Sequence, residues 1–110
     1  MSATAANSER HCGWTNWETW CVNLWLTNDQ GTEELCQEMA EQARQAAEDH
    51  PCVRSGVWEP DEAPKYLLAD MLKDFAEDNA PELQGLYVDL LNAALSEVDW
   101  HEIAESLLEE

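Results

Sequence analysis

Apolar side chains recur at every third or fourth position in each long segment of this chain of 110 residues. This spacing places them on one face of an α-helix, whereas a strand would require apolar and polar residues to alternate. No alternating run of strand length occurs, and no internal repeat is visible. We therefore expect an all-α fold, a compact bundle of about five amphipathic helices. The expected helices cover residues 15–28, 32–50, 65–78, 81–95 and 99–108.

The length supports a single domain, because two independent cores would each be short of apolar material. Residues 1–12 show no periodicity and are predicted to form a mobile arm, followed by a single helical domain over residues 13–110. Residues 51–64 contain three prolines and one glycine without a sustained pattern. They indicate a loop anchored by Val57 and Trp58, with room for a short extended piece.

The first two helices have recognisable start signals. Thr15 and Glu18 fit a capping box, in which a hydroxyl and a carboxylate satisfy free backbone N–H groups. The polar residues 28–31 are expected to end this helix. Thr32 is then the expected cap of the second helix, whose first turn is acidic as the helix dipole favours.

Two later helices also carry local signals. Pro81 suits the first position of the fourth helix, which has the most apolar stripe of all. Asp99 and Glu102 form a second capping arrangement. Val98 and Ile103 stand where a hydrophobic staple would pair them, so the last helix is expected to begin at residue 99 or 100.

Tryptophan is the most distinctive residue of the first helix. Trp17, Trp20 and Leu24 fall at i, i+3 and i+7, so we predict that they face the core. Tryptophan is large and highly buried on average, which favours this interpretation. The alternative is an exposed aromatic anchor for a protein partner, because Trp is enriched at interface hot spots.

Charge is the main clue to function. The chain has 24 Asp and Glu against 5 Lys and Arg, a net charge of −19. Eleven acids and no Lys or Arg lie between Asp74 and the C-terminus. Like charges at helical spacing destabilise a helix, so an indifferent surface would mix in Lys. The predicted partner-binding carboxylates form columns on three helices: Glu34, Glu38, Glu41, Asp70, Asp74, Glu77, Asp78, Glu102, Glu105, Glu109 and Glu110.

These columns approach the charge density of DNA. Neighbouring carboxylates on a helix stand about 5–6 Å apart, and each strand of duplex DNA presents one charge per ~3.4 Å. A scaffold of two or three such columns suits a basic groove that binds DNA. Because its field is uninterrupted in sequence, the C-terminal third is expected to contribute most.

Several functions are excluded by the same charge. A strongly negative field repels phosphate, so direct nucleic-acid binding and anionic membranes are not expected. No apolar run reaches the ~20 residues of a membrane span, and no signal peptide is visible. We therefore expect a cytoplasmic protein, in the host cytoplasm if phage-encoded, with its four cysteines as thiols.

No catalytic constellation is evident, and we predict a protein that is not an enzyme and has no cofactor or metal. His101, Glu102 and Glu105 resemble the H-E-x-x-H zinc helix, with Glu in place of the second His. No third ligand lies nearby, and capping already accounts for Glu102. Phosphate loops, nucleophile elbows, C-x-x-C pairs and EF-hand spacing are all missing from the sequence.

Two segments resemble small acidic proteins of phages and mobile elements that carry an N-[WY]-E-T-W core. The first is GWTNWETWCVNLWL at residues 13–26, and the second is LLNAALSEVDWHEIAE at residues 90–105. In its acidity and helicity the chain is also similar to the DNA-mimic inhibitors of restriction enzymes and CRISPR effectors. It departs from the most extreme mimics in retaining five basic residues: Arg10, Arg44, Arg54, Lys65 and Lys73.

The sequence therefore predicts a non-enzymatic inhibitor, a monomer or small symmetric oligomer. Its partner would be a basic nucleic-acid-binding protein of a host defence complex, either a CRISPR effector or a restriction enzyme. One alternative is a salt-adapted cytosolic protein whose acidity carries no partner information. Another is a regulatory adaptor that docks through its Trp-rich first helix.

Overall fold

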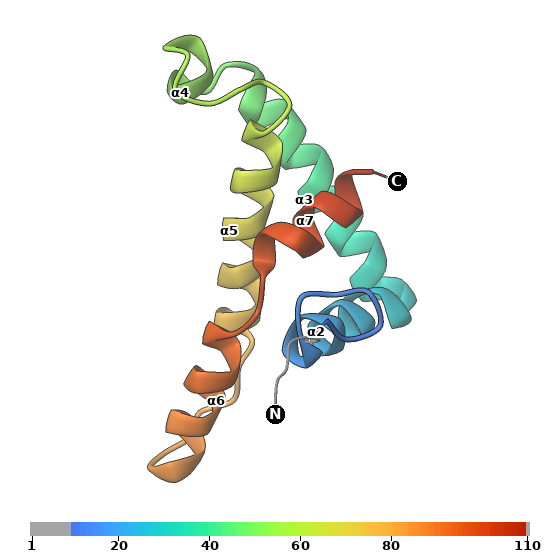
Figure 1. Cartoon of the computed structure of the whole chain (residues 1–110), viewed down its shortest axis with the longest axis vertical. Helices are drawn as coiled ribbons and strands as arrows, with labels where there is room; N and C mark the ends of the chain where they lie inside the picture. Colours follow the sequence, from blue (N-terminus) through green and yellow to red (C-terminus); the bar gives the residue numbers. More distant parts are fainter. Residues whose placement is uncertain (1–9, 110) are drawn as a thin grey trace.

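The computed structural model describes residues 10–109, and within this range the chain forms helices and no strand (Figure 1). This confirms the predicted all-α fold. The first nine residues of the predicted arm lie outside the described range. The helices are α2 (Trp17–Asn28), α3 (Gln30–Glu48), α4 (Pro51–Arg54), α5 (Ala63–Asp78), α6 (Leu86–Ser96) and α7 (Trp100–Leu108).

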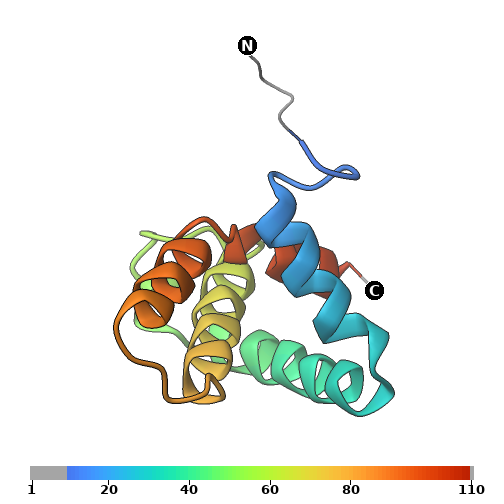
Figure 2. The same cartoon turned by 90° about the horizontal axis from the view of Figure 1, so that it is seen from below.

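Three helices build the core. α3 and α5 pack against each other, α7 crosses both, and α2 packs on α3 and α7 (Figures 1 and 2). Small residues of α3 allow the close approach of its neighbours, since Ala40 and Ala43 are fully buried. The buried cluster consists of Leu26, Cys36, Met39, Ala40, Ala43, Leu68, Leu72, Val98, Trp100, Ile103, Ala104 and Leu107. No helix among the described residues is long and apolar enough to cross a membrane.

The caps of α2 and α3 differ from the sequence-based prediction. Asn16, not Thr15, caps α2 and accepts a hydrogen bond from the Thr19 backbone N–H. Asp29, not Thr32, caps α3, because its carboxylate accepts both the backbone N–H and the hydroxyl of Thr32. These bonds lower the pKa of Asp29, the backbone bond most. The expected break at residues 28–31 thus shrinks to a single residue between two helices.

The segment between α3 and α5 contains a short helix where the sequence suggested a loop with an extended piece. Pro51 lies in the first turn of α4, and the His50 imidazole caps it by accepting the Cys52 N–H at 3.1 Å. Trp58 then folds back, donating its backbone N–H to the Cys52 carbonyl at 2.9 Å. Its ring stacks on His50 with centroids 4.7 Å apart.

α6 begins later than predicted and contributes no buried residue. Its first residue is Leu86, preceded by Gly85 at φ 60°, so Pro81 does not begin the helix. A positive φ favours glycine because it has no Cβ. The helix runs beside the end of α5 and occupies one end of the molecule's longest axis (Figures 1 and 2).

The start of α7 follows the prediction in part. The Asp99 carboxylate caps the helix by accepting the Glu102 N–H at 3.1 Å, and Val98 and Ile103 are both buried in the core. The reciprocal bond from the Glu102 side chain to the Asp99 N–H is absent between these described residues. That N–H donates instead to the hydroxyl of Thr19 on α2.

Candidate partner-binding surface

α2 turns its largest apolar side chains outward. Trp17 is 53% exposed, Leu24 42% and Trp25 74%, whereas Thr19 and Leu26 are buried. The prediction that Trp17 and Leu24 face the core is therefore wrong, while Trp20 is half-buried. The outward face of α2 is defined here as Trp17, Leu24 and Trp25.

A polar clasp holds this orientation. We use this name for Asn16, Thr19, Asp99 and Glu102 together with Thr15 and Arg10. The Thr19 hydroxyl donates to the Asn16 side-chain oxygen at 2.6 Å and accepts the Asp99 N–H at 2.8 Å. Asn16 also donates its side-chain N–H to the Glu97 carbonyl. Because Thr19 is fully buried, these bonds fix which face of α2 points inward.

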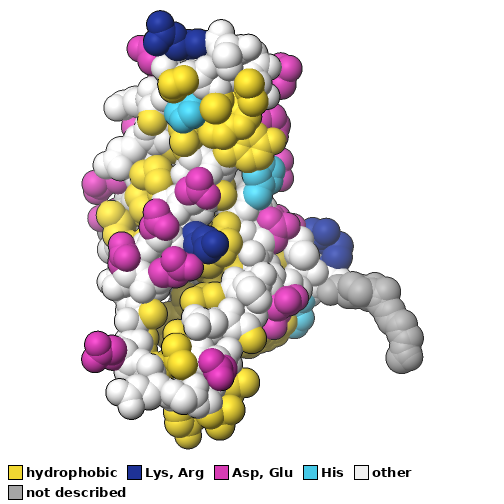
Figure 3. Space-filling model, turned by 90° about the vertical axis from the view of Figure 1, so that its left-hand side faces the viewer, with side chains coloured by type: hydrophobic (Ala, Val, Ile, Leu, Met, Phe, Trp, Pro, Cys, Tyr) yellow, Lys and Arg dark blue, Asp and Glu magenta, His cyan; other side chains and the backbone are white. Residues whose placement is uncertain are grey.

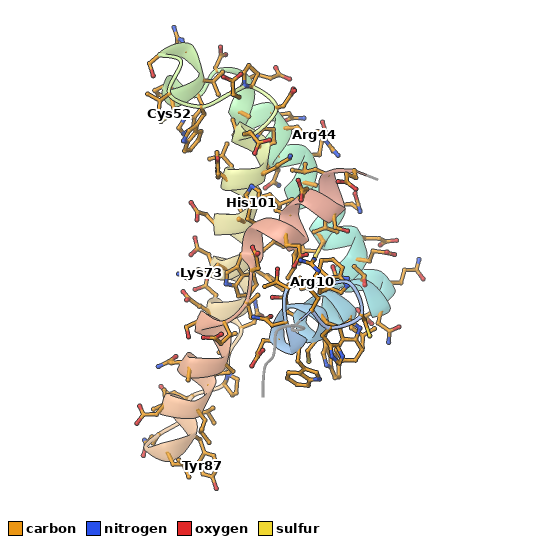
Figure 4. All side chains as sticks on the ribbon, viewed as in Figure 1. Arg10, Arg44, Cys52, Lys73, Tyr87 and His101 are labelled. Atoms are coloured by element: carbon orange, nitrogen blue, oxygen red, sulfur yellow. The ribbon has the colours of Figure 1, made fainter. Side chains whose placement is uncertain are left out.

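The Glu102 carboxylate supplies the other bonds of the polar clasp, one of which is an ion pair. One oxygen of Glu102 accepts the Thr15 backbone N–H at 2.9 Å, and the other binds Arg10 at 2.7 Å (Figure 4). Arg10 also donates to the Gly13 carbonyl, across a turn closed by two hydrogen bonds between His11 and Trp14. Arg10, placed by the sequence in the arm, is thus joined to α7.

The predicted carboxylates of α3 and α5 are exposed. On α3, Glu41 is paired with Arg44 at 3.2 Å, an exposed pair that contributes little. Lys73, on α5, is exposed and makes no ion pair within the described part of the chain. The predicted residues that the structure exposes on these two helices are Glu34, Glu38, Glu41, Asp70, Asp74, Glu77 and Asp78. Figure 3 shows acidic side chains on one side of the molecule, in separate groups among hydrophobic ones.

The α7 column is different, because basic residues from elsewhere in the chain interrupt it. Glu102 binds Arg10, and Glu105 binds Lys65 at 3.1 Å. Lys65 also binds Glu62 at 3.0 Å, and the two carboxylates, Glu62 most, raise the pKa of Lys65. The field expected to be uninterrupted in the C-terminal third is therefore partly neutralised. Glu109 is exposed, and Glu110 lies outside the described residues.

His101 and Glu105, the pair that resembles a zinc helix, face different partners. The His101 ring lies 5.4 Å from that of Tyr66, and its Nε2 is 3.9 Å from Glu62. This Nε2 has no hydrogen-bond partner among the described residues, whereas Glu105 binds Lys65. No group of three or more His, Cys, Asp or Glu in the described range could hold a metal ion.

The cysteines are all free. Burial raises the pKa of Cys36 to about 11, with a smaller contribution from Glu33. At neutral pH this thiol is therefore protonated and a poor nucleophile.

An apolar groove separates α2 from α6. It has a volume of about 130 Å³, and Glu18 is its only charged lining residue. The apolar residues that line it are Trp17, Cys21, Val22, Ala94, Leu95 and Val98. Of the outward face of α2, Trp17 lines this groove, opposite Ala94 and Leu95 of α6.

Comparison with known protein families gives a single assignment. Residues 7–107 match a family of unknown function, DUF7249. The chain belongs to the DUF7249 family. The match covers the helices from α2 to α6, all of α7 except its last residue, and the whole polar clasp. No curated protein and no solved structure matches the DUF7249 chain.

Sequence reasoning missed the polar clasp of this DUF7249 protein. The bonds that join its two ends link residues 80 or more positions apart, such as Thr15 to Asp99 and Arg10 to Glu102. Helical periodicity reports only neighbours within a helix. The available signal was the pair of segments that the sequence analysis singled out together, residues 13–26 and 90–105. In the structure these two segments bind each other.

Proposed function

We propose that this protein is a non-enzymatic acidic inhibitor that binds the basic nucleic-acid channel of a host defence complex, a CRISPR effector or a restriction enzyme. The observation that carries the proposal is the set of exposed carboxylates on α3 and α5, few of which are paired with Lys or Arg. The choice of a defence complex rests on the resemblance to DNA-mimic inhibitors.

The charge density supports the proposal. The molecule extends 44 Å along its longest axis. A DNA duplex of that length carries roughly 26 charges, at one per ~1.7 Å of axis. The chain has 24 acids and a net charge of −19, which approaches this density.

The binding would rest on the same electrostatics as DNA binding, with carboxylates in the place of the DNA phosphates. Lys and Arg of the partner channel would exchange their counterions for the carboxylates, and counterion release makes such binding strongly salt-dependent. Helices suit this role because they hold successive carboxylates at fixed spacing. Four carboxylates engaged by Lys or Arg within the protein are less available: Glu41, Glu62, Glu102 and Glu105.

The test is inhibition of DNA cleavage by a panel of purified CRISPR effector complexes and restriction enzymes. For a target that is inhibited, the double variant Asp70→Lys with Asp74→Lys should weaken inhibition at least tenfold. A matched control, Glu59→Lys with Asp61→Lys, changes the net charge equally at exposed loop positions outside the columns. It should have a much smaller effect. Equal losses of inhibition in the two variants would show that inhibition depends on net charge alone and not on the position of the carboxylates in the columns.

Salt and competition provide an independent readout. The affinity for the target should fall steeply as salt rises, and DNA should compete for the same channel. Formation of a ternary complex with DNA, at an affinity indifferent to salt, would rule out DNA mimicry.

The outward face of α2 favours a second candidate, a regulatory adaptor that docks through its Trp-rich helix. Trp17, Leu24 and Trp25 supply large apolar area of the kind that dominates protein interfaces. In this case Trp25→Ala should abolish partner binding and leave the melting temperature unchanged. The Asp70 and Asp74 reversal should then have little effect, which separates the two candidates.

A further inference from the structure

α6 exposes an apolar stripe that the body of the protein does not cover. Leu86 is 65% exposed, Tyr87 66% and Leu90 57%, and the helix contains no buried residue. Figure 3 shows hydrophobic side chains gathered at the end of the molecule where α6 lies, and Figure 4 places Tyr87 at its tip. Monomeric proteins rarely expose large contiguous apolar patches without a binding role.

The stripe is continuous and nearly free of charge. Leu86, Leu90 and Ala93 follow one another at i, i+4 and i+7, with Tyr87 and Ala94 beside them, and therefore share one face. The single charged residue of the helix, Asp89, lies with Asn92 and Ser96 along another edge, as their spacing of three and seven requires. An isolated helix of eleven residues is marginal in water, so covering this face would stabilise α6.

The order of side-chain sizes along the stripe is self-complementary. The N-terminal end carries the bulky Leu86 and Tyr87, and the C-terminal end carries the small Ala93 and Ala94. In an antiparallel pair centred on Leu90, Leu86 of each copy would lie opposite Ala94 of the other. Large residues then meet small ones at both ends, beside the apolar groove of each copy. An arrangement of this kind defines an isologous two-fold interface.

We propose that a second copy of this chain covers the stripe, with α6 packed antiparallel on α6 of the other copy about a two-fold axis at Leu90. The proposal does not depend on the function proposed above. The interface of one short helix pair is smaller than the roughly 800 Å² per partner of a standard complex, so we expect a micromolar dissociation constant.

The position of α6 limits repulsion between two acidic bodies. α6 lies at one end of the longest axis, so pairing there directs the two bodies apart (Figure 1). Most of their charges would then be separated by more than a Debye length, ~8 Å at physiological salt. Asp89, on α6 itself, remains close to the interface. Dimerisation should therefore strengthen as salt rises, whereas binding to a basic partner should weaken.

The experiment is sedimentation velocity on the full chain at about 1 µM and 100 µM, over salt from 0.05 to 0.5 M. We expect twice the monomer mass of 12.5 kDa at the higher concentration. Leu90→Glu should return the mass to that of the monomer, because it places two carboxylates at the axis. Circular dichroism checks that this exposed substitution leaves the body folded. The matched control Val57→Glu, at a position 71% exposed near α4, should leave the dimer intact.

Hydrogen exchange gives a second measurement that does not depend on a variant. The α6 amides should gain protection with protein concentration, while those of α3 should not. A monomer at 100 µM with unprotected α6 amides would overturn the proposal. A dimer that persists in Leu90→Glu, or one that is lost in Trp25→Glu and not in Leu90→Glu, would move the interface away from α6 and also overturn it.

Discussion

At the scale of single residues, a buried threonine decides the orientation of the tryptophans. Thr19 is fully buried, and its hydroxyl joins the cap of α2 to the first residue before α7. A buried hydroxyl is tolerated only where its hydrogen bonds are made. The inward face of α2 is therefore set by polar bonds and not by the largest apolar groups.

We predict that Thr19→Val destabilises the protein by about 1–3 kcal/mol, because it leaves the buried Asp99 N–H without an acceptor and removes one of the two hydrogen bonds that the Asn16 oxygen accepts. The shape of the side chain is nearly unchanged, so packing loss is small. Thr27→Val is the matched control, since its hydroxyl bonds only within α2, to the Asn23 carbonyl. Urea unfolding of both variants measures the difference. Equal stabilities would show that the polar clasp contributes little.

At the scale of helices, the start of α3 provides a test of capping. Asp29→Ala should lower the melting temperature by a few degrees, because the Thr32 backbone N–H loses its acceptor. Thr32→Ala should cost less, since it removes only the hydroxyl bond. Asp49→Ala at the opposite end of α3 is the control. Removing a negative charge near a helix C-terminus should be neutral or stabilising.

The pH dependence of this cap has a definite sign. The hydrogen bonds lower the pKa of Asp29 below its ordinary 3.8, so the folded state favours the carboxylate. The stabilisation is therefore present above pH 3.8 and is lost as the pH falls through the lowered pKa. The melting temperatures of wild type and Asp29→Ala should converge at low pH. A constant difference down to pH 2 would contradict the assigned cap.

The sequence predicted the helical class and the cap at Asp99, because both depend on neighbouring residues. It failed for α2, which is apolar on more than one side. Trp17 and Leu24 lie on one stripe and Val22 and Leu26 on another, so periodicity offered two orientations and residue size favoured the wrong one. For α6 the sequence showed the most apolar stripe of all the helices. It did not show that Leu86, Tyr87 and Leu90 of this stripe are exposed, because exposure depends on the tertiary fold.

The candidate site was also predicted only in part from the sequence. The α3 and α5 columns are exposed as surface carboxylates of amphipathic helices should be. The α7 column is not free, because Arg10 and Lys65 approach Glu102 and Glu105 from distant parts of the chain. Pairs of this kind depend on the tertiary fold. Charge counts along the sequence assigned the C-terminal third a field that the basic residues partly neutralise.

At the scale of the whole molecule, stability and negative charge oppose each other. The engaged carboxylates tie α7 to the N-terminal turn and to α5, and the remaining ones repel across exposed faces. A field of this strength destabilises a compact state by self-repulsion. A salt-adapted protein would need molar salt to hold its core. The protein proposed here should be predominantly helical at 0.05 M salt without added metal, as circular dichroism can measure.

Asp74 is the position where this repulsion is most concentrated. Asp70, Glu77 and Asp78 stand four residues before it and three and four after it on α5. Each like-charge pair at such spacing costs about 0.2–0.5 kcal/mol, so Asp74→Asn should stabilise the protein by roughly 0.5–1.5 kcal/mol at low salt. The gain should disappear near 1 M salt, where the Debye length falls to ~3 Å. Asp61→Asn, in the loop before α5, should produce no comparable gain. Urea unfolding at both salt concentrations measures these effects, and a stabilisation that survives 1 M salt would assign the effect of Asp74 to local helix propensity instead of charge.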